Sequence, residues 1–514
     1  MVFALFFVLS FVAIGCWSFA NPLVAAPDEQ AHVIRAFALD HGQMGSNSTK
    51  SDKVLVTVRV PASINEVKYS MTCWQFHALV PASCSPAWTT SQRPVWTTTH
   101  VGHYPPLYYA LVGTGSLVDH QRGAIYAMRL ASAAIAAAML ALSAYVVARW
   151  SRRRSLAAGI FVALTPITLF LSGSVNPSGF EIVVAICLWT AVTVLALDQR
   201  DDPPKALVAI IALAASVLVL IRGLSPLWVA LVALALIGLL GAPRVVSLVQ
   251  ARRDVRWAAA IVTTATFVAI AWIVSQGTLN VLASHVVLDP DTSFASILRI
   301  VGAHGYQWLK ESVGVLGWLD TPLPKALYLA WYALIAGVVA LGLVVAGWRQ
   351  RTVLAAICLL SFVVPVLLVS EKARVNGIVW QGRDGMPLSV GALVLGAALW
   401  TRSVGPQLIQ RVVTTAVVGV TTVLGMIAFY VNLRRYAVGV DGPHLFFVHD
   451  TGWSPPTGQM LTLVLYGVVT TLIAALVVAW VWSGSREATA TTRRVEYSAP
   501  QSTIRILDHP RPEV

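Results

Sequence analysis

The sequence contains very little charge. Only 11% of its 514 residues are charged, whereas 57% are hydrophobic. A soluble domain of this composition would expose large apolar patches and would associate. Acidic residues are especially scarce, because 23 Asp and Glu stand against 36 Lys and Arg, for a net charge of +13. The composition therefore excludes an ordinary soluble protein and indicates a chain that lies largely within a membrane.

The sequence also lacks the motifs of nucleotide and thiol chemistry. It has no phosphate-binding loop of the Walker type, no glycine pattern of a dinucleotide-binding domain and no CxxC pair. Energy coupling by ATP is therefore unsupported.

Apolar segments of spanning length recur along the whole chain. A bilayer core requires roughly 20 apolar residues to cross it, so we expect an all-α polytopic membrane protein with about twelve transmembrane helices. The first segment has no basic flank of the kind that precedes a secretion signal, and we expect it to be kept rather than cleaved. The predicted spans are 3–20, 124–148, 156–173, 179–197, 206–221, 224–241, 257–275, 326–347, 352–370, 386–400, 411–432 and 459–482.

Basic residues gather in alternate connections, such as Arg152, Arg153 and Arg154. Because basic loops are retained in the cytoplasm, we expect both termini to be cytoplasmic in a bacterial plasma membrane. Topology accounts for most of the positive charge, so no nucleic-acid partner is needed. The transmembrane domain is predicted over 1–482 and a disordered cytoplasmic tail over 483–514. The segments expected outside are 21–122, which should have mixed structure, 276–325, 371–385 and 433–458.

Cys73 and Cys84 are the two of the five cysteines that lie outside the predicted spans. An oxidising exterior favours a disulfide between them. The alternative is a pair of buried thiols.

A carboxylate pair, Asp28 and Glu29, follows the first apolar segment. Asp28 is expected to cap a helix on which His32 lies one turn away and Arg35 lies near both. Acids at a membrane border are costly unless they are used, which favours catalytic roles for Asp28 and Glu29 and substrate contacts for His32 and Arg35. The alternative is a helix cap with a dipole-stabilised acid.

A second cluster contains Lys372, Arg374 and Arg383, with Arg383 just before a predicted span. Arginine makes forked hydrogen bonds that match phosphate oxygens, so these bases could hold an anionic lipid headgroup. The alternatives are ion pairs with Glu371 or Asp384, or side chains that reach ordinary lipid headgroups.

A third group precedes the second span and contains His100, His103, Tyr104 and Tyr108. Two prolines predict a short helix that lies along the interface, where tyrosine is favoured. Such a helix could line a groove for an isoprenoid chain or a sugar ring, or it could be a simple anchor. The two histidines could bind a metal with Asp28, although their spacing is a weak signal. Further along, Asp320 could be a second carboxylate or a capping residue.

Four short motifs in this order resemble those of the DUF2142 family of polytopic bacterial membrane proteins. They are Pro27-Asp28-Glu29-Gln30-Ala31-His32, Pro105-Pro106-Leu107-Tyr108-Tyr109, Gly317-Trp318-Leu319-Asp320 and Gln381-Gly382-Arg383. The resemblance extends over about residues 3 to 482. One departure is that Asp384 follows Arg383 where a tyrosine is expected. This acid would weaken phosphate binding at Arg383 unless it faces a base such as Lys372 or Arg374.

That family is similar in plan to the GT-C class of glycosyltransferases, so the resemblance implies sugar transfer from a polyprenyl-phosphate donor to an envelope glycan or glycolipid. Asp28 would be the general base, and Glu29 would orient the acceptor. Arg383, helped by Lys372 or Arg374, would stabilise the leaving phosphate, while His32 would hold Asp28 or the donor. Direct displacement predicts inversion. No cofactor is required, although a divalent metal held by Asp28, Glu29 and a histidine is an alternative.

Two other classes of function remain open from the sequence. A transporter or flippase of lipid-linked sugars would place ionisable residues near the midplane of its spans, often with an internal repeat. A non-catalytic partner in envelope assembly would tolerate loss of Asp28. The abundance of Ala and Val with a basic balance is a compositional hint of an actinobacterial source.

Overall fold

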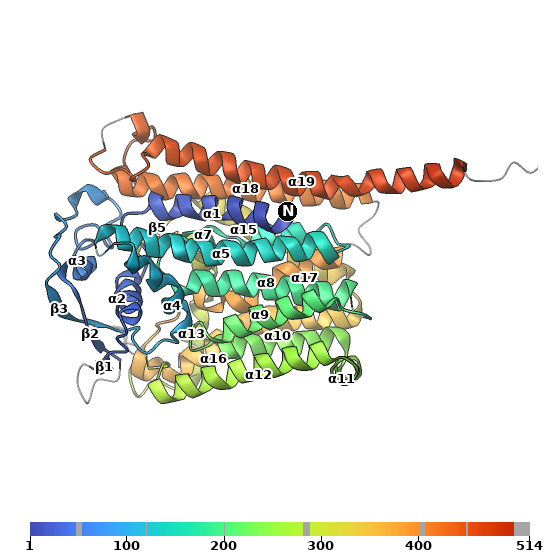
Figure 1. Cartoon of the computed structure of the whole chain (residues 1–514), viewed down its shortest axis with the longest axis horizontal. Coiled ribbons are helices and arrows are strands. Elements are labelled where there is room, and N and C mark those ends of the chain that lie inside the picture. The colour runs from blue at the N-terminus through green and yellow to red at the C-terminus, as the bar shows by residue number, and fades with distance from the viewer. Residues whose placement is uncertain are drawn as a thin grey trace, which may run out of the picture.

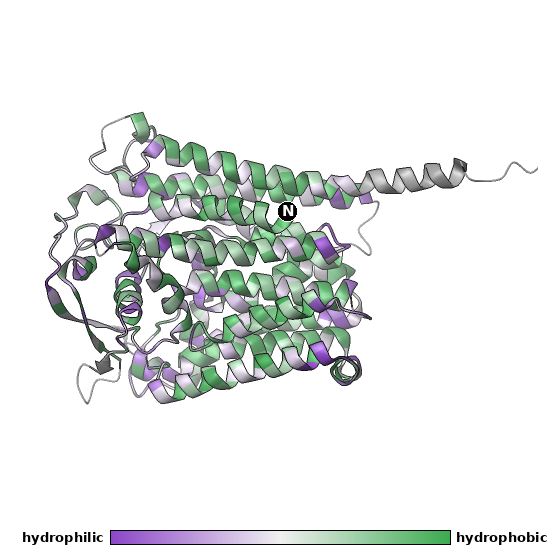
Figure 2. Cartoon of the chain, in the orientation of Figure 1, coloured by the Kyte–Doolittle hydropathy of each residue, from purple (hydrophilic) through white to green (hydrophobic). Residues whose placement is uncertain are grey.

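Long helices run side by side, and a smaller part made of strands and short helices covers one end of them (Figure 1). The computed structural model describes residues 1–47, 54–119, 121–199, 201–280, 288–400, 407–448 and 451–497. The long helices are mostly hydrophobic, and hydrophilic residues gather towards their two ends (Figure 2). This distribution is the one that a bilayer imposes on a bundle of spanning helices.

Eight of the described helices are long and apolar enough to cross a membrane. A ninth is possible if α10 (Ser225–Leu240) and α11 (Ala242–Ala251), which meet at a bend of 100°, form one span. The predicted class, an all-α polytopic membrane protein, is confirmed, but the count of about twelve is not. The eight are α1 (Val2–Ala20), α5 (Arg122–Trp150), α8 (Pro177–Asp198), α12 (Arg253–Gln276), α15 (Lys325–Val345), α16 (Trp348–Asn376), α18 (Gln407–Val438) and α19 (Gln459–Tyr497).

The remaining predicted spans are helical but short. The segment 156–173 divides into α6 (Leu156–Ala163) and α7 (Pro166–Ser172), because Pro166 cannot donate the hydrogen bond that would continue α6. α9 (Lys205–Val219), α10 and α17 (Met386–Leu399) have 14 to 16 residues. At about 1.5 Å per residue they reach roughly 24 Å at most, less than the hydrocarbon thickness of roughly 30 Å.

The first predicted outer segment forms a small mixed unit at one end of the bundle (Figure 1). Its antiparallel sheet has the order β1-β2-β3, and alternate residues of β2 are buried, as expected for a strand with one covered face. Its elements are α2 (Glu29–Asp40), β1 (Ser46–Asn47), β2 (Val56–Pro61), α3 (Ala62–Asn65), η1 (Glu66–Lys68), η2 (Ala82–Cys84), β3 (Pro94–Thr99), α4 (Leu107–Gly113) and η3 (Thr114–Leu117).

The other predicted outer segments contain more helix than expected. Lys372 and Arg374 belong to the end of α16 rather than to a loop. The long helix α19 continues to Tyr497, so the first part of the predicted disordered tail is helical, and 498–514 lie outside the described residues. The remaining elements are α13 (Phe294–Ala303), α14 (Gly305–Gly314), β4 (Val315–Leu316), β5 (Thr321–Pro322), η4 (Gly382–Gly385) and η6 (Phe446–Val448).

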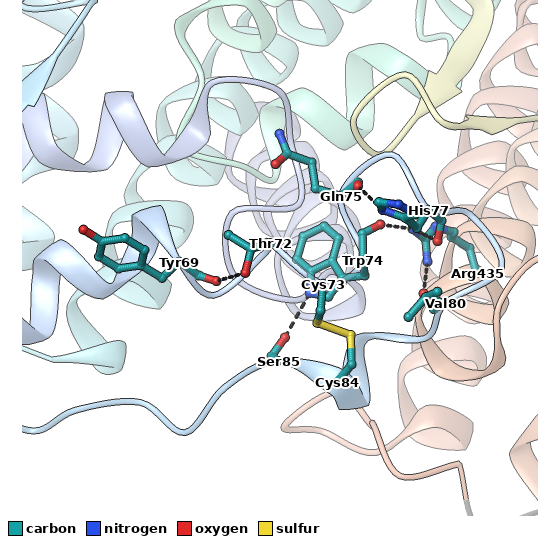
Figure 3. The surroundings of a disulfide bond; sticks show 10 residues. All are labelled: Tyr69, Thr72, Cys73, Trp74, Gln75, His77, Val80, Cys84, Ser85 and Arg435. Carbon is teal, nitrogen blue, oxygen red and sulfur yellow. Dashed lines mark hydrogen bonds between the residues drawn. A yellow bond between two sulfur atoms is a disulfide. The ribbon is translucent and has the colours of Figure 1, made fainter.

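A disulfide joins Cys73 and Cys84, and the loop between them is held by Arg435 of α18 (Figure 3). The guanidinium donates hydrogen bonds to the carbonyl oxygens of Trp74, at 2.8 Å, and Val80, at 2.7 Å. The same side chain contacts the Asp320 carboxylate at 3.2 Å. One buried arginine thus fixes the disulfide loop to a transmembrane helix.

Candidate functional site

Asp28 lies between the side chains of Arg383 and His100 at the border of the helical bundle. Its Oδ2 is 2.9 Å from Nη2 of Arg383, and its Oδ1 is 3.5 Å from Nε2 of His100. The side chain is 33% exposed, so a ligand can reach the carboxylate. Asp28 has φ 65°, a left-handed conformation that aspartate adopts more readily than most residues.

The prediction that the Asp28 side chain caps α2 is wrong. Asp28 occupies the N-cap position, but its side chain makes no capping hydrogen bond. The carboxylate is instead engaged by Arg383 and His100.

Arg383 is carried by the short turn η4, directly before α17, and is buried. The preceding Gly382 donates its backbone N–H to Oε2 of Glu311 at 2.7 Å. A Cβ at Gly382 would lie 2.1 Å from the carbonyl oxygen of Trp308, so only glycine fits there. Gln381 and Asp384 close the turn with a reciprocal capping box. The turn therefore holds the guanidinium against Asp28.

The sequence suggested that Asp384 could face Lys372 or Arg374, but in the structure it faces a different base. Its carboxylate lies 2.9 Å from Arg222, which also contacts Glu181 at 3.1 Å. Ser225 donates a hydrogen bond to the same glutamate at 2.7 Å. Because Arg222 neutralises Asp384, Arg383 remains directed at Asp28.

Opposing effects set the protonation of this cluster. Burial raises the pKa of Asp28, but the hydrogen bond from His100 and the charge of Arg383 outweigh it and hold the pKa well below its usual range. Burial lowers the pKa of His32 well below its usual value. Near neutral pH, Asp28 is therefore ionised and His32 is neutral. The His32 Nδ1 lies 2.8 Å from the Tyr109 hydroxyl.

Glu29 is turned away from Asp28 into the protein interior. Its carboxylate contacts Nε and Nη2 of Arg129, each at 2.7 Å, and both side chains are fully buried. It also accepts the backbone N–H of Val175 at 2.9 Å. Glu29 has no surface left for an acceptor, so the structure places it in a supporting position rather than in the catalytic role that we expected.

The loop that carries Asp28 is fixed by several distant elements. Arg129 donates to the carbonyl oxygens of Ser18, Asn21 and Pro22. The Trp318 indole donates to the Val24 carbonyl at 3.0 Å. These contacts satisfy carbonyls that the end of α1 leaves without partners and hold the loop in a single conformation.

Some predicted ligands lie close to the Asp28 cluster. Tyr104 lies close to Arg222, and its ring centroid is 6.2 Å from that of His32. His100 was considered only as a metal ligand, yet it contacts Asp28 directly. Glu181 and Arg222 were not among the predicted site residues. The signal that could have found them is a charged residue at the end of an apolar segment.

Other predicted ligands have structural partners elsewhere. The hydroxyl of buried Tyr108 lies 3.0 Å from Ser132, so the interpretation of this tyrosine as a membrane anchor is wrong. The His103 carbonyl accepts from Thr278 at 2.7 Å, and buried Arg35 donates to the Met44 carbonyl at 3.0 Å.

The two bases at the end of α16 also point elsewhere. Lys372, whose side chain is 63% exposed, pairs with Glu371, and Arg374 donates to the Thr292 carbonyl.

The set of Asp28, Glu29 and a histidine considered for a metal is not brought together. Within the described ranges, no group of three or more His, Cys, Asp and Glu side chains could hold a metal ion. The reason is that Glu29 is directed at Arg129.

The fold and the site define a polytopic helical membrane protein with a buried charge cluster at one end of its bundle. A family model described as "Predicted membrane protein (DUF2142)" matches residues 11–392. The chain therefore belongs to the DUF2142 family, as its motifs had indicated.

No curated protein matches the sequence. A crystal structure of ArnT from Cupriavidus metallidurans bound to undecaprenyl phosphate is similar with a TM-score of 0.42 and 13% sequence identity, over 97% of this chain and 80% of that chain.

Proposed function

We propose that the protein is a membrane glycosyltransferase that transfers a sugar from a polyprenyl-phosphate donor to an envelope glycan or glycolipid. The observation that carries the proposal is an ionised, accessible carboxylate, Asp28, 2.9 Å from a buried arginine, Arg383, at the membrane border. A base and a phosphate ligand at this depth suit a donor whose tail lies in lipid and whose sugar lies in water.

In the proposed reaction, Asp28 takes the proton from the acceptor hydroxyl as its oxygen attacks the anomeric carbon. The bond between that carbon and the phosphate oxygen breaks, and its electron pair leaves with the phosphate. Arg383 stabilises the negative charge that grows on the phosphate, which lowers the barrier because this interaction strengthens in the transition state. A single displacement inverts the anomeric carbon.

The contact between Asp28 and Arg383 has a direct consequence for this mechanism. A carboxylate with a depressed pKa is a weak base. A donor phosphate competes with Asp28 for Arg383, and a guanidinium that turns towards the phosphate no longer depresses the pKa of Asp28. Donor binding would thereby strengthen the base, while His100 continues to contact it.

The proposal places the Asp28 end of the bundle outside the cell. Its support is the gathering of basic residues at the connections of the other end, where Arg153 pairs with Asp198 and Arg252 pairs with Asp254.

The experiment is transfer of radiolabelled sugar from polyprenyl-phosphate donors in membranes, at equal expression. Asp28→Asn should abolish transfer and keep donor binding, whereas Arg383→Ala should weaken both. Asp441→Asn and Arg374→Ala are matched controls, because both side chains are exposed, and both should behave like the wild type.

Transfer by the Asp28→Asn variant at the wild-type rate would show that Asp28 is not the general base. Movement of intact lipid-linked sugar across vesicles, without transfer, would assign the protein to flippases instead.

A further inference from the structure

An apolar cavity of about 290 Å³ lies between helices α1, α5, α6, α18 and α19. Its lining includes Phe6 of α1, Ala144 of α5, Phe161 of α6, Gly425 of α18 and Ile473 of α19. An apolar cavity of about 150 Å³ already stays dry and binds small apolar molecules. A space of this size within a membrane is therefore suited to an apolar ligand.

Most of the few hydroxyl groups on the cavity wall are used within their own helices. Ser143 donates to the Met139 carbonyl, Thr422 to the Val418 carbonyl and Thr470 to the Tyr466 carbonyl. These groups have little left with which to orient a sugar or another polar ligand. The wall thus selects a hydrocarbon chain.

The cavity follows α1 from Val2 to Ile14, so one of its ends lies at the end of this helix opposite to Asp28. Val2 and Leu5 at the start of α1 line it, whereas Asp28 follows the other end of the same helix. A helix of 19 residues is about 28 Å long. A lipid whose headgroup lies at the cavity end is therefore not a donor whose phosphate reacts at Asp28.

A basic and aromatic rim adjoins the cavity. The guanidinium of Arg154 lies over the ring of Trp480, a lining residue, at 4.1 Å, and donates to the Trp480 carbonyl at 3.0 Å. Asp198, an acid at the same end of the bundle, is paired with Arg153 at 2.9 Å. Such a rim favours an anionic headgroup.

We propose that this cavity holds one acyl chain of an anionic phospholipid, with the lipid phosphate at Arg154. The chain would fill the space between α1 and the pair α18 and α19, which run side by side over it (Figure 1). The proposal is independent of the glycosyltransferase activity.

The test uses the full-length protein, purified in detergent and mixed with equal amounts of phosphatidylglycerol and phosphatidylcholine before native mass spectrometry. Each arginine near a lipid phosphate is worth about a fivefold preference, since it contributes about 1 kcal/mol. We expect one tightly retained phosphatidylglycerol.

Two variants separate the cavity from its rim. Ala144→Phe should fill the cavity and lose the retained lipid, while Ala233→Phe, an exposed alanine on α10, should keep it. Arg154→Gln leaves the cavity intact and should abolish the preference for phosphatidylglycerol, whereas Arg152→Gln, at an exposed position, should not.

Equal retention of the two lipids by the wild type would overturn the proposal. So would retention of the lipid by a folded Ala144→Phe protein, or a retained species whose mass is that of a polyprenyl phosphate.

Discussion

Asp28 and Glu29 are neighbours in the sequence with different surroundings. Adjacent residues at a helix start point in different directions, and the left-handed conformation of Asp28 adds to the divergence. Asp28 reaches Arg383 and the surface, whereas Glu29 reaches the interior and Arg129.

Replacement of these two acids should therefore have different effects. Glu29→Gln leaves Arg129 buried without its counter-charge, which costs about 3–5 kcal/mol of stability. Asp28→Asn, at an accessible position, should keep the fold and lose transfer. Thermal unfolding in detergent checks this difference, and an unchanged melting temperature for Glu29→Gln would contradict it.

The pH dependence of transfer should report the exchange of Arg383 between Asp28 and the donor. Without a donor, the hydrogen bond from His100 and the charge of Arg383 depress the pKa of Asp28 despite its burial. Loss of Arg383 to the phosphate raises that pKa. The acid limb of kcat, which reports the donor complex, should lie about 1–2 pH units above the acid limb of kcat/KM, which reports the free enzyme. Coincident limbs would show that Arg383 stays on Asp28.

The sequence located the acid and the arginine but not the contacts around them. Asp28 stood out because an acid at a membrane border is costly, and Arg383 because of its family motif. The contact between Asp28 and Arg383 joins residues that are 355 positions apart in the sequence. No local pattern reports such a distance, and the pairing of Asp384 with Arg222 was missed for the same reason.

At the scale of elements, the disulfide loop depends on α18 as well as on its own bridge. Arg435 binds carbonyls of Trp74 and Val80 and pairs with Asp320. Arg435 therefore holds the loop at residues between Cys73 and Cys84, in addition to the disulfide that joins its two ends.

Arg435→Met should release this loop even with the disulfide intact. It removes the donors to the loop carbonyls and leaves Asp320, whose side chain is only 7% exposed, without its cationic partner. We expect faster cleavage near the loop in limited proteolysis than in the Cys73→Ser, Cys84→Ser double variant, whose bridge closes a short loop worth about 3 kcal/mol. Arg434→Met is the control, and equal protection of the Arg435→Met and wild-type proteins would refute the clamp.

The helices were located well from hydropathy, but their lengths were not. Each predicted apolar segment is helical, since a chain in lipid must satisfy its own backbone groups. Short helices such as α17 are equally apolar because they are buried in protein, and composition does not distinguish burial in protein from exposure to lipid. Pro166, which divides one segment, was the local signal for a break.

At the scale of the whole molecule, the orientation in the membrane is open to a direct test. In a Cys358→Ser background, which removes the half-buried free cysteine, a membrane-impermeant maleimide should label Trp96→Cys in intact cells. Trp96 is 72% exposed on β3. Arg152→Cys, at the other end, should react only after permeabilisation. The reverse pattern would place Asp28 in the cytoplasm.

The wide separation of the site residues along the chain also sets an order of events during synthesis. Asp28 leaves the ribosome early, and Arg129 follows soon enough to fix Glu29. Arg383 is made 355 residues after Asp28, which at 5–20 residues per second is a delay of about 20–70 s. A nascent chain therefore exposes Asp28 at the membrane long before Arg383 is made, and the contact between the two forms only when nearly all of the bundle has been inserted.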